Sequence, residues 1–561
     1  MSATLVRTIV RALALVLLAV ASVIVAPATA TATADDLTPV NYTWEEVYFH
    51  SAKGDEIHAD VIRPAGIPAD RKTPVMLTVG AYRSHTAYIS EPHLTRGPST
   101  TDLHIADFLA RGYTYVIADV PSYGGSTGCP DWGGPTERAG VKAAVEWAAA
   151  QPWSTGNVGM YGLSYEGFTG LMALAERPKG LAAVAASSPP ADPYSYMYMQ
   201  GIPFRFTAKP VIDSGVKPSN IFIAPEHAVI SQTPGRPDDT DHYRANASST
   251  PQACYDAFVA SLNERDPNSQ FWKDRDLMSR IAGNDTPVFI TQGFLDRNTR
   301  ADRVVDLWNS LPNPENKAWF GQMGHADCYK DCRETYPSEI LAFMDKHVAK
   351  RPRTVPGPKV TVGAYDGTWR SEAAFPPADT RRVPITLRTG TFVDRGLIQG
   401  GDRDIWTISP PLAVAQHLSG APSMTASARG PANAPIAGEV FDIAPDGRAT
   451  PITRGIAPLG DGQPAIRMLQ EDWPIAKGHR IGVKITNTVD HEWAADTTGA
   501  QVHVDRAEVQ LPLLDAVRHP DLTGPVNPLI AKLMREKTIQ LPQDFIASVE
   551  TPMDLPARHG G

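Results

Sequence analysis

Basic clusters, internal repeats and late apolar runs are all missing from this chain of 561 residues. Its 52 Lys and Arg are outnumbered by 61 Asp and Glu, and this balance without basic clusters argues against nucleic acid as a partner. Beyond the N-terminal region, no segment stays apolar over the ~20 residues that a membrane span requires. With 42% apolar and 20% charged residues, the composition is that of an ordinary globular protein.

Cysteine is also scarce, since only Cys129, Cys254, Cys328 and Cys332 are present. The C-x-x-x-C pair at 328–332 has neither a second C-x-x-C nor paired histidines beside it, which argues against a structural zinc site. Four cysteines permit three disulfide pairings, and all three stay open. In one of them Cys328 and Cys332 close a small loop and leave Cys129 and Cys254 for a second bond. Neither a metal nor an organic cofactor is expected.

The first 34 residues are typical of a secretory signal. Arg7 and Arg11 form the positive n-region, and the apolar segment at 12–25 is too short for a membrane span. Possible cleavage sites of the A-x-A type end at Ala30, Ala32 and Ala34. An uncleaved membrane anchor is the alternative. We expect cleavage and export, which removes two arginines and leaves 50 basic against 61 acidic residues, a net charge of −11.

Periodicity divides the mature chain, whose length predicts two or three domains. Apolar strands alternate with helical stretches at 38–190 and again at 285–350, which predicts a mainly parallel α/β sheet. The intervening residues 191–284 lose this alternation and contain short helical pieces. They are therefore expected to form a helical cap inserted into the α/β domain.

A proline-rich linker at 351–358 indicates the next domain boundary. Residues 356–515 consist of short strands separated by Gly, Pro and Asp turns, the pattern of an all-β sandwich or jelly roll. Residues 516–561 form a C-terminal extension with one helical stretch at 527–537.

The most informative motif is Gly-Leu-Ser-Tyr-Glu-Gly at 162–167. An apolar run precedes it and a helical pattern follows, and strand–turn–helix is the context of a nucleophile elbow. Such a turn exposes the Ser164 hydroxyl and aims the backbone N–H of Tyr165 at a developing oxyanion. The literal G-x-S-x-G spelling occurs at 124–128, but no helix follows Ser126. Context therefore favours Ser164 over Ser126 as the nucleophile.

A serine nucleophile needs a base, and the base needs an orienting carboxylate. In α/β-hydrolases these residues follow in the order Ser, acid, His, in loops after late strands. The expected strand at 288–292 leads to Asp296, and the one at 317–320 leads to His325. Alternatively, Asp296 caps a turn or pairs with Arg297, and His325 is an ordinary loop residue. Chain order and placement favour the triad.

The oxyanion hole needs a second donor besides the Tyr165 amide. In this fold the donor comes from the loop after an early strand, which here spans 80–83. We expect the Tyr82 phenol to be this donor. The alternative is that Tyr82 is an aromatic side chain packed beside the cleft.

Together these residues resemble the X-Pro dipeptidyl-peptidase and cocaine esterase group of serine hydrolases, which includes α-amino acid ester hydrolases and glutaryl acylases. The resemblance lies in the elbow with its late second glycine, Glu-Trp at 146–147, Gln-Pro-Trp-Ser at 151–154, Gly-x-x-Asp at 293–296, Gly-His at 324–325, Trp-Arg at 369–370 and Phe-Pro-Pro at 375–377. It implies an α/β-hydrolase domain, an inserted helical cap and a C-terminal jelly roll over nearly the whole mature chain.

The resemblance also implies site residues. Ser164 would be the nucleophile, Asp296 the acid and His325 the base, and Tyr82 matches the family tyrosine that supplies an oxyanion donor. One departure lies in the loop at 119–128. The family pattern there is Asp-x-Arg-Gly-x-Gly-x-Ser-x-Gly, and this chain lacks the Arg-Gly pair.

The expected reaction is hydrolysis of a small ester or a short peptide through an acyl-Ser164 intermediate. X-Pro dipeptidyl-peptidase-like activity is the first candidate, and cocaine esterase-like or α-amino acid ester hydrolase activity is the alternative. Asp192 is the only acid where the ester hydrolases bind the substrate ammonium, and an Asp-Pro turn is the preferred explanation of it, so selectivity for a free amine is unsupported. Residues 194–199 would line an apolar acyl pocket or pack in the core.

A catalytically silent secreted binding protein is the rival from another class. The sequence predicts no nucleic-acid partner and no membrane contact after signal cleavage, and it does not indicate an oligomeric state.

Overall fold

The computed structural model describes residues 41–68, 70–81, 104–204, 240–325, 335–395, 404–489, 492–493, 495, 497–523 and 528–556. The predicted signal, Tyr82, Cys328 and Cys332 lie outside these residues.

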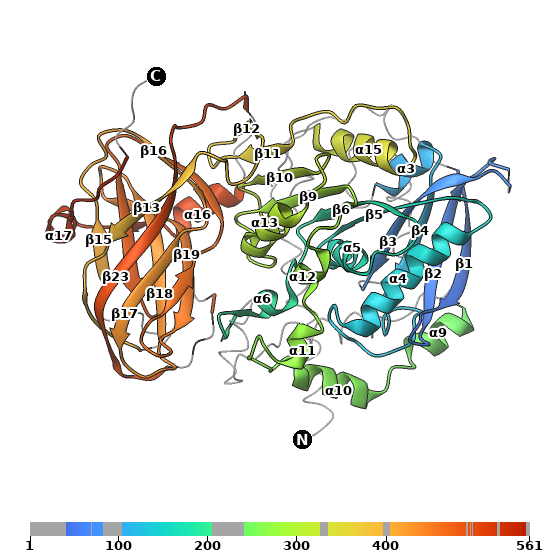
Figure 1. The fold of residues 1–561 in the computed structure, drawn as a ribbon, viewed down its shortest axis with the longest axis horizontal. Coiled ribbons are helices and arrows are strands. Elements are labelled where there is room, and N and C mark those ends of the chain that lie inside the picture. Colours follow the sequence, from blue (N-terminus) through green and yellow to red (C-terminus); the bar gives the residue numbers. More distant parts are fainter. Residues whose placement is uncertain are drawn as a thin grey trace, which may run out of the picture.

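A mixed sheet of 11 strands forms the centre of the larger domain (Figure 1). In spatial order the strands are β1 (Tyr42–His50), β2 (Glu56–Pro64), β4 (Thr114–Asp119), β3 (Thr73–Gly80), β5 (Ser154–Leu163), β6 (Leu181–Ser187), β9 (Val288–Gly293), β10 (Lys317–Gly321), β11 (Val360–Gly363), β12 (Thr368–Glu372) and β24 (Leu522–Thr523). From β4 to β11 all neighbours pair in parallel, whereas pairing at both ends is antiparallel. The predicted α/β class is therefore confirmed.

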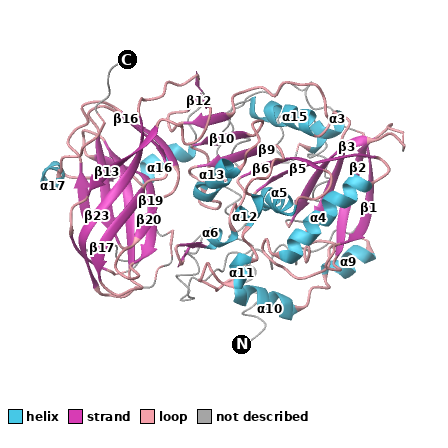
Figure 2. Ribbon diagram, viewed as in Figure 1, coloured by secondary structure: helices cyan, strands magenta, loops and turns pink. Residues whose placement is uncertain are grey.

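Helices cover both faces of this sheet (Figure 2). One layer contains α4 (Pro135–Ala150), α5 (Tyr165–Glu176) and α13 (Ala301–Ser310), and the other contains α3 (Ile105–Ala110) and α15 (Thr335–His347). Successive side chains of a strand point to opposite faces. Along β3, Val75 and Leu77 accordingly join the first core, while Met76 joins the second. Burial of both faces explains why these strands are almost continuously apolar.

The predicted cap region contains short elements between β6 and β9. These are α6 (Pro193–Met197), β7 (Tyr198–Met199), β8 (Ile202–Pro203), α9 (Asp241–Ala247), α10 (Gln252–Ser261), α11 (Gln270–Lys273) and α12 (Leu277–Ile281). Residues 205–239 of this region lie outside the described part. Of the helices that the structure describes in this region, all but α6 lie after residue 240.

Two antiparallel sheets form the C-terminal β domain and share one apolar core. The first contains β13 (Thr380–Thr386), β14 (Gly390–Val393), β16 (Gln416–Gly420), β17 (Ser423–Arg429), β20 (Ala465–Arg467), β21 (Glu471–Ile475) and β23 (Gln501–Leu514). The second contains β15 (Ile405–Ile408), β18 (Pro435–Ile443), β19 (Arg448–Pro458), β22 (Arg480–Thr486) and β25 (Ile539–Gln540). Helices α16 (Pro528–Glu536) and α17 (Gln543–Val549) follow near the C-terminus.

The chain stays in the central sheet beyond the predicted linker. Strand β11 pairs in parallel with β10, and β12 pairs with β11. Residues 360–372 therefore belong to the α/β sheet and not to the β domain in which the predicted boundary at 356 placed them. The local pattern of short strands and turns is the same in both settings, so only the long-range pairing separates them.

Buried charges join the central sheet to the β domain. Arg370 on β12 donates to both carboxylate oxygens of Asp472 on β21, at 2.8 Å each. The His417 ring lies 2.9 Å from the same carboxylate through Nε2, and all three side chains are buried. This contact gives a physical reason for the Trp-Arg motif at 369–370.

Across the described ranges, the structure contains no helix that combines the length and apolarity needed to cross a membrane.

Candidate active site

Ser164 lies at the sharp turn between β5 and α5, as predicted for a nucleophile elbow. Its backbone has φ 57° and ψ −118°, a region that non-glycine residues rarely adopt, and its side chain is partly exposed. A Cβ on Gly162 would lie 2.4 Å from the Cβ of Glu166, so only glycine fits there. The motif therefore encodes a tight strand-to-helix turn that accommodates Glu166 in place of the usual glycine.

Asp296 and His325 are brought together by the loops after β9 and β10. Asp296 Oδ2 lies 2.9 Å from His325 Nδ1. The carboxylate is buried and accepts further hydrogen bonds from the amides of Asn298 and Thr299, at 2.8 and 2.9 Å, and from the Thr299 hydroxyl at 2.6 Å. The turn-capping alternative for Asp296 is therefore part of the same arrangement: the carboxylate caps the turn and also orients the imidazole.

Close backbone approach makes this loop pairing possible. A Cβ on Gly293 would lie 2.0 Å from the carbonyl oxygen of Met323, two residues before His325. The amide of Leu295 donates to the same carbonyl at 3.1 Å. Gly293 thus lets the acid loop contact the histidine loop directly.

The three predicted residues follow strands that end at one edge of the sheet. The Ser164 amide donates to the Ser187 carbonyl at the end of β6, at 2.8 Å. The Ser188 amide in turn donates to Thr291 on β9, also at 2.8 Å. Because the carboxyl ends of parallel strands meet at this edge, Ser164 lies on the same side of the sheet as Asp296 and His325.

Tyr165 opens helix α5, whose first N–H groups have no intrahelical acceptor and carry the positive end of the helix dipole. Its phenol donates to Glu137 Oε2 on α4 at 2.8 Å. Burial is the largest influence on Glu137 and raises its pKa, although the Gly133 amide acts in the opposite direction. The sequence does not predict a role for Glu137, because nothing local in α4 indicates a contact with a residue 28 positions later.

Tyr82, the predicted second oxyanion donor, falls outside the described residues. The last described residue before it is Ala81, directly after β3. Strand β3 lies beside β5, which leads to Ser164. The assignment of Tyr82 stays a prediction.

The contacts of Ser126 are those of a structural residue. Its hydroxyl donates to the Asp119 carbonyl and accepts from the His58 amide, at 2.9 Å each, and the side chain is buried. The choice of Ser164 over Ser126 agrees with these contacts.

Asp192 already has partners. The Nε of Arg303 lies 3.4 Å from its carboxylate, and the Ser195 hydroxyl donates to it. The adjoining segment 194–199 was expected to line an apolar pocket or to pack in the core. Tyr198 packs in the core and also lines a cavity of about 500 Å³, but Arg265, Asp302 and Arg467 line that cavity too, so its wall is not apolar.

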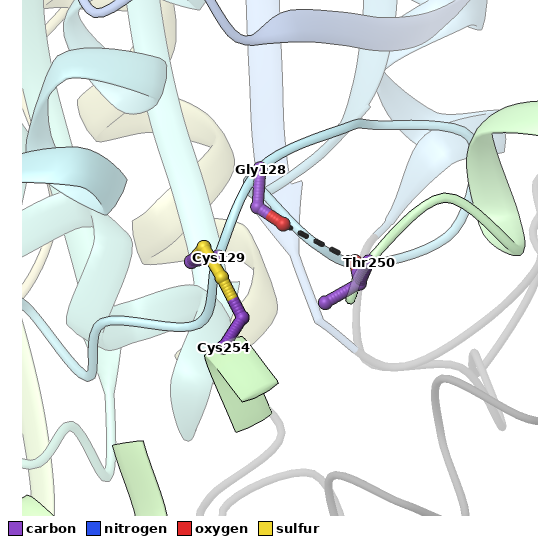
Figure 3. The surroundings of a disulfide bond; sticks show 4 residues. All are labelled: Gly128, Cys129, Thr250 and Cys254. Carbon is purple, nitrogen blue, oxygen red and sulfur yellow. Dashed lines mark hydrogen bonds between the residues drawn. A yellow bond between two sulfur atoms is a disulfide. The ribbon is translucent and has the colours of Figure 1, made fainter. Parts of the chain in front are cut away.

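A disulfide joins Cys129, in the loop after β4, to Cys254 on α10 (Figure 3). Nearby, the Thr250 hydroxyl donates to the Gly128 carbonyl at 3.2 Å. These contacts fasten the second half of the predicted cap to the α/β domain. The pairing is the one that leaves Cys328 and Cys332 for each other, although those two lie outside the described residues.

We expect the double variant Cys129→Ala/Cys254→Ala to lose about 2–4 kcal/mol of unfolding free energy, because the bond closes a loop across 125 positions and restricts the unfolded chain. Thermal unfolding of the variant and the wild type measures the difference. An unchanged melting temperature would contradict this prediction.

Sequence comparison relates this chain to a known family. The profile of the X-Pro dipeptidyl-peptidase (S15) family matches residues 53–327, which include Ser164, Asp296 and His325. The matched residues make up just under half of the chain and support its assignment to this family. This match agrees with the resemblance inferred from the sequence.

Individual relatives are distant. A protein assigned as an Xaa-Pro dipeptidyl-peptidase in Streptomyces avermitilis is 25% identical over 69% of this chain and 58% of its own length. The cocaine esterase of a Rhodococcus species is 26% identical over 60% of each chain. This chain thus spans less than two thirds of either relative.

A solved CocE/NonD family hydrolase from Staphylococcus aureus has a similar fold. Its TM-score is 0.67 at 13% sequence identity, with coverage of 84% of this chain and 94% of the other. This similarity supports the predicted α/β-hydrolase fold with its additional C-terminal β domain.

The departure from the family loop pattern has a structural correlate. Ser122, which stands where the family pattern has glycine, adopts φ 71°. Its buried hydroxyl has no hydrogen-bond partner within the described part of the chain. Serine at this position therefore lowers the stability of the fold in two ways, through its positive φ and through the desolvation of its unpaired hydroxyl.

We expect Ser122→Gly to raise the unfolding free energy by about 1 kcal/mol, since it relieves the positive φ and removes the unpaired hydroxyl. Chemical denaturation checks the value. Ser122→Ala separates the two causes, because alanine removes the hydroxyl but keeps the strained Cβ. If Ser122→Gly were less stable than the wild type, the backbone of Ser122 would not be strained.

Proposed function

We propose that this protein is an exported serine hydrolase that cleaves an ester or amide bond through an acyl-Ser164 intermediate. The observation that carries the proposal is the hydrogen-bond distance of 2.9 Å between Asp296 and His325 at the sheet edge where Ser164 occupies a strained elbow. In this mechanism His325 takes the hydroxyl proton as Ser164 Oγ attacks the substrate carbonyl.

The developing oxyanion is stabilised by the Tyr165 amide and the Tyr82 phenol. Protonated His325 then returns its proton to the leaving alcohol or amine. Water, activated by the same histidine, hydrolyses the acyl-enzyme and restores Ser164. Asp296 orients the imidazole and stabilises its charged form throughout.

X-Pro dipeptidyl-peptidase-like activity is our first candidate for the substrate class, because family membership points to it. An esterase of the cocaine esterase type is the second candidate, and the environment of Asp192 favours it. The Asp192 carboxylate already pairs with Arg303, so its charge is not left for a substrate ammonium.

Two measurements test this proposal. A fluorophosphonate probe should label the wild-type protein, whereas a binding protein without a reactive serine should not react. Initial rates on Xaa-Pro-nitroanilides, amino-acid esters and simple aryl esters then rank the substrate classes. Cleavage of aryl esters without any activity on Xaa-Pro substrates would favour the esterase.

Export rests on the N-terminal segment and is supported by the Cys129–Cys254 bond, because disulfides persist in oxidising compartments. N-terminal sequencing of the protein from culture medium should find a start directly after Ala30, Ala32 or Ala34. Retention of Arg7 in a cell-associated protein would contradict export.

A further inference from the structure

Glu137 is a buried carboxylate that contacts the elbow of the candidate active site. Its Oε2 accepts from the Tyr165 hydroxyl at 2.8 Å and from the Gly133 amide at 2.7 Å. Its Oε1 accepts from the amides of Asp131 and Trp132, at 3.0 and 2.9 Å. Four donors therefore converge on one carboxylate with no exposed surface.

The three amides form an anion-binding nest. Trp132 and Gly133 both have positive φ, 40° and 73°, so that successive N–H groups point to one centre. The loop is also fixed from the other side, since Arg275 of the predicted cap pairs with Asp131. Glu137 is thus rigidly placed before it contacts Tyr165.

The Tyr165 ring is enclosed as well. It contacts the rings of Trp132 and Phe168, with centroids 5.5 and 5.7 Å apart, both edge to face. With the phenol fixed by Glu137, the ring has little freedom to shift. The backbone of Tyr165 follows directly after Ser164, whose strained conformation persists only when surrounding contacts enforce it.

We propose that Glu137 is a positioning residue, which acts through the Tyr165 phenol to keep the Tyr165 amide aimed at the oxyanion. This inference rests on the proposed function, in which that amide stabilises the charge formed during Ser164 attack. Placement matters energetically, because a displacement of 1 Å in a catalytic group can cost about a hundredfold in rate.

Tyr165→Phe is the sharpest test, because it removes only the hydroxyl and leaves the nest occupied. We expect kcat on the best ester substrate to fall roughly tenfold to a hundredfold, less than the 10²–10³ that loss of an oxyanion donor costs. The value of KM should stay within about threefold, because the amide acts mainly in the transition state.

Tyr161→Phe is the matched control. Tyr161 lies on β5, three residues before Ser164, and its buried hydroxyl has no hydrogen-bond partner among the described residues. The same atom is removed from the same residue type without loss of a hydrogen bond. We expect this variant to keep the wild-type kcat.

Glu137→Gln and the double variant Glu137→Gln/Tyr165→Phe complete the cycle. If Glu137 acts through the phenol, the double variant is about as slow as the slower single variant. A merely structural role would lower the melting temperature but leave kcat per active site, titrated with the fluorophosphonate, unchanged. That result, or independent losses that multiply, would overturn the inference.

Ser164→Ala keeps the two proposals apart. An inactive Ser164→Ala together with a fully active Tyr165→Phe would refute the positioning role while the proposed function stands. An active Ser164→Ala would refute the proposed function itself. If Glu137→Gln fails to fold, the comparison of Tyr165→Phe with Tyr161→Phe still decides the question.

Discussion

Replacement of Ser164 by alanine is expected to lower kcat by about 10⁴-fold or more while the fold stays intact, because the proposed acyl-enzyme forms on the Ser164 hydroxyl. Alanine would have to adopt the same strained φ of 57° as serine, so the free energy of unfolding should change little. Steady-state rates on the best substrate, together with thermal unfolding, check both expectations. Substantial residual hydrolysis would contradict the role of Ser164.

Ser126→Ala is the natural counterpart, since Ser126 stands in the literal G-x-S-x-G motif. It should retain activity and lose about 1–3 kcal/mol of stability, because the His58 amide and the Asp119 carbonyl lose a buried partner. Ser164→Ala should therefore lose activity and keep its stability, whereas Ser126→Ala should keep its activity and lose stability. If Ser126→Ala were the inactive variant, the elbow assignment would be wrong.

Asp472→Asn is expected to give the largest loss of stability, about 3–5 kcal/mol, because it breaks the buried, doubly hydrogen-bonded ion pair of Arg370 and leaves Glu372, 2.8 Å from Arg370 Nε, as the remaining carboxylate partner. Burial alone would raise the pKa of Asp472, but His417 and Arg370 together keep that pKa far below its ordinary value. The carboxylate is therefore charged at any working pH, and its neutral replacement removes a real charge. Chemical denaturation measures the loss.

Asp505→Asn provides the control for this change. Arg429 also donates twice to Asp505, at 2.8 Å each, but both side chains are exposed. Exposed pairs add little to stability because solvent screens them. We expect no measurable change, and equal behaviour of the two variants would refute the importance of the buried pair.

Local patterns predicted the parts of this fold whose cause is local. Alternating apolar strands and helices marked β3, β4 and α4, and chain order placed Asp296 and His325 after successive strands. The contacts that escaped prediction join residues far apart. Glu137 contacts Tyr165 from another helix, and Arg370 pairs with Asp472, which lies more than a hundred positions later in the chain. No periodicity encodes such a partner, because each residue alone is compatible with a solvated surface.

The pairing of cysteines illustrates the same limit. Spacing allowed three arrangements, and the selected one depends on how the loop after β4 meets α10. Likewise, β11 and β12 were assigned to the wrong domain because a short strand has the same sequence character in either sheet.

The edge pairing of β12 changes how the C-terminal part of the molecule should be regarded. The chain leaves the central sheet after Glu372 and returns to it at Leu522, where β24 pairs with Trp369 and the Asp521 amide donates to the same residue at 2.9 Å. In topology the strands from β13 to β23 are thus an excursion with both ends tied to the central sheet, not a detachable tail. A truncation after Glu372 would uncover an unpaired strand edge, the kind of surface at which chains self-associate.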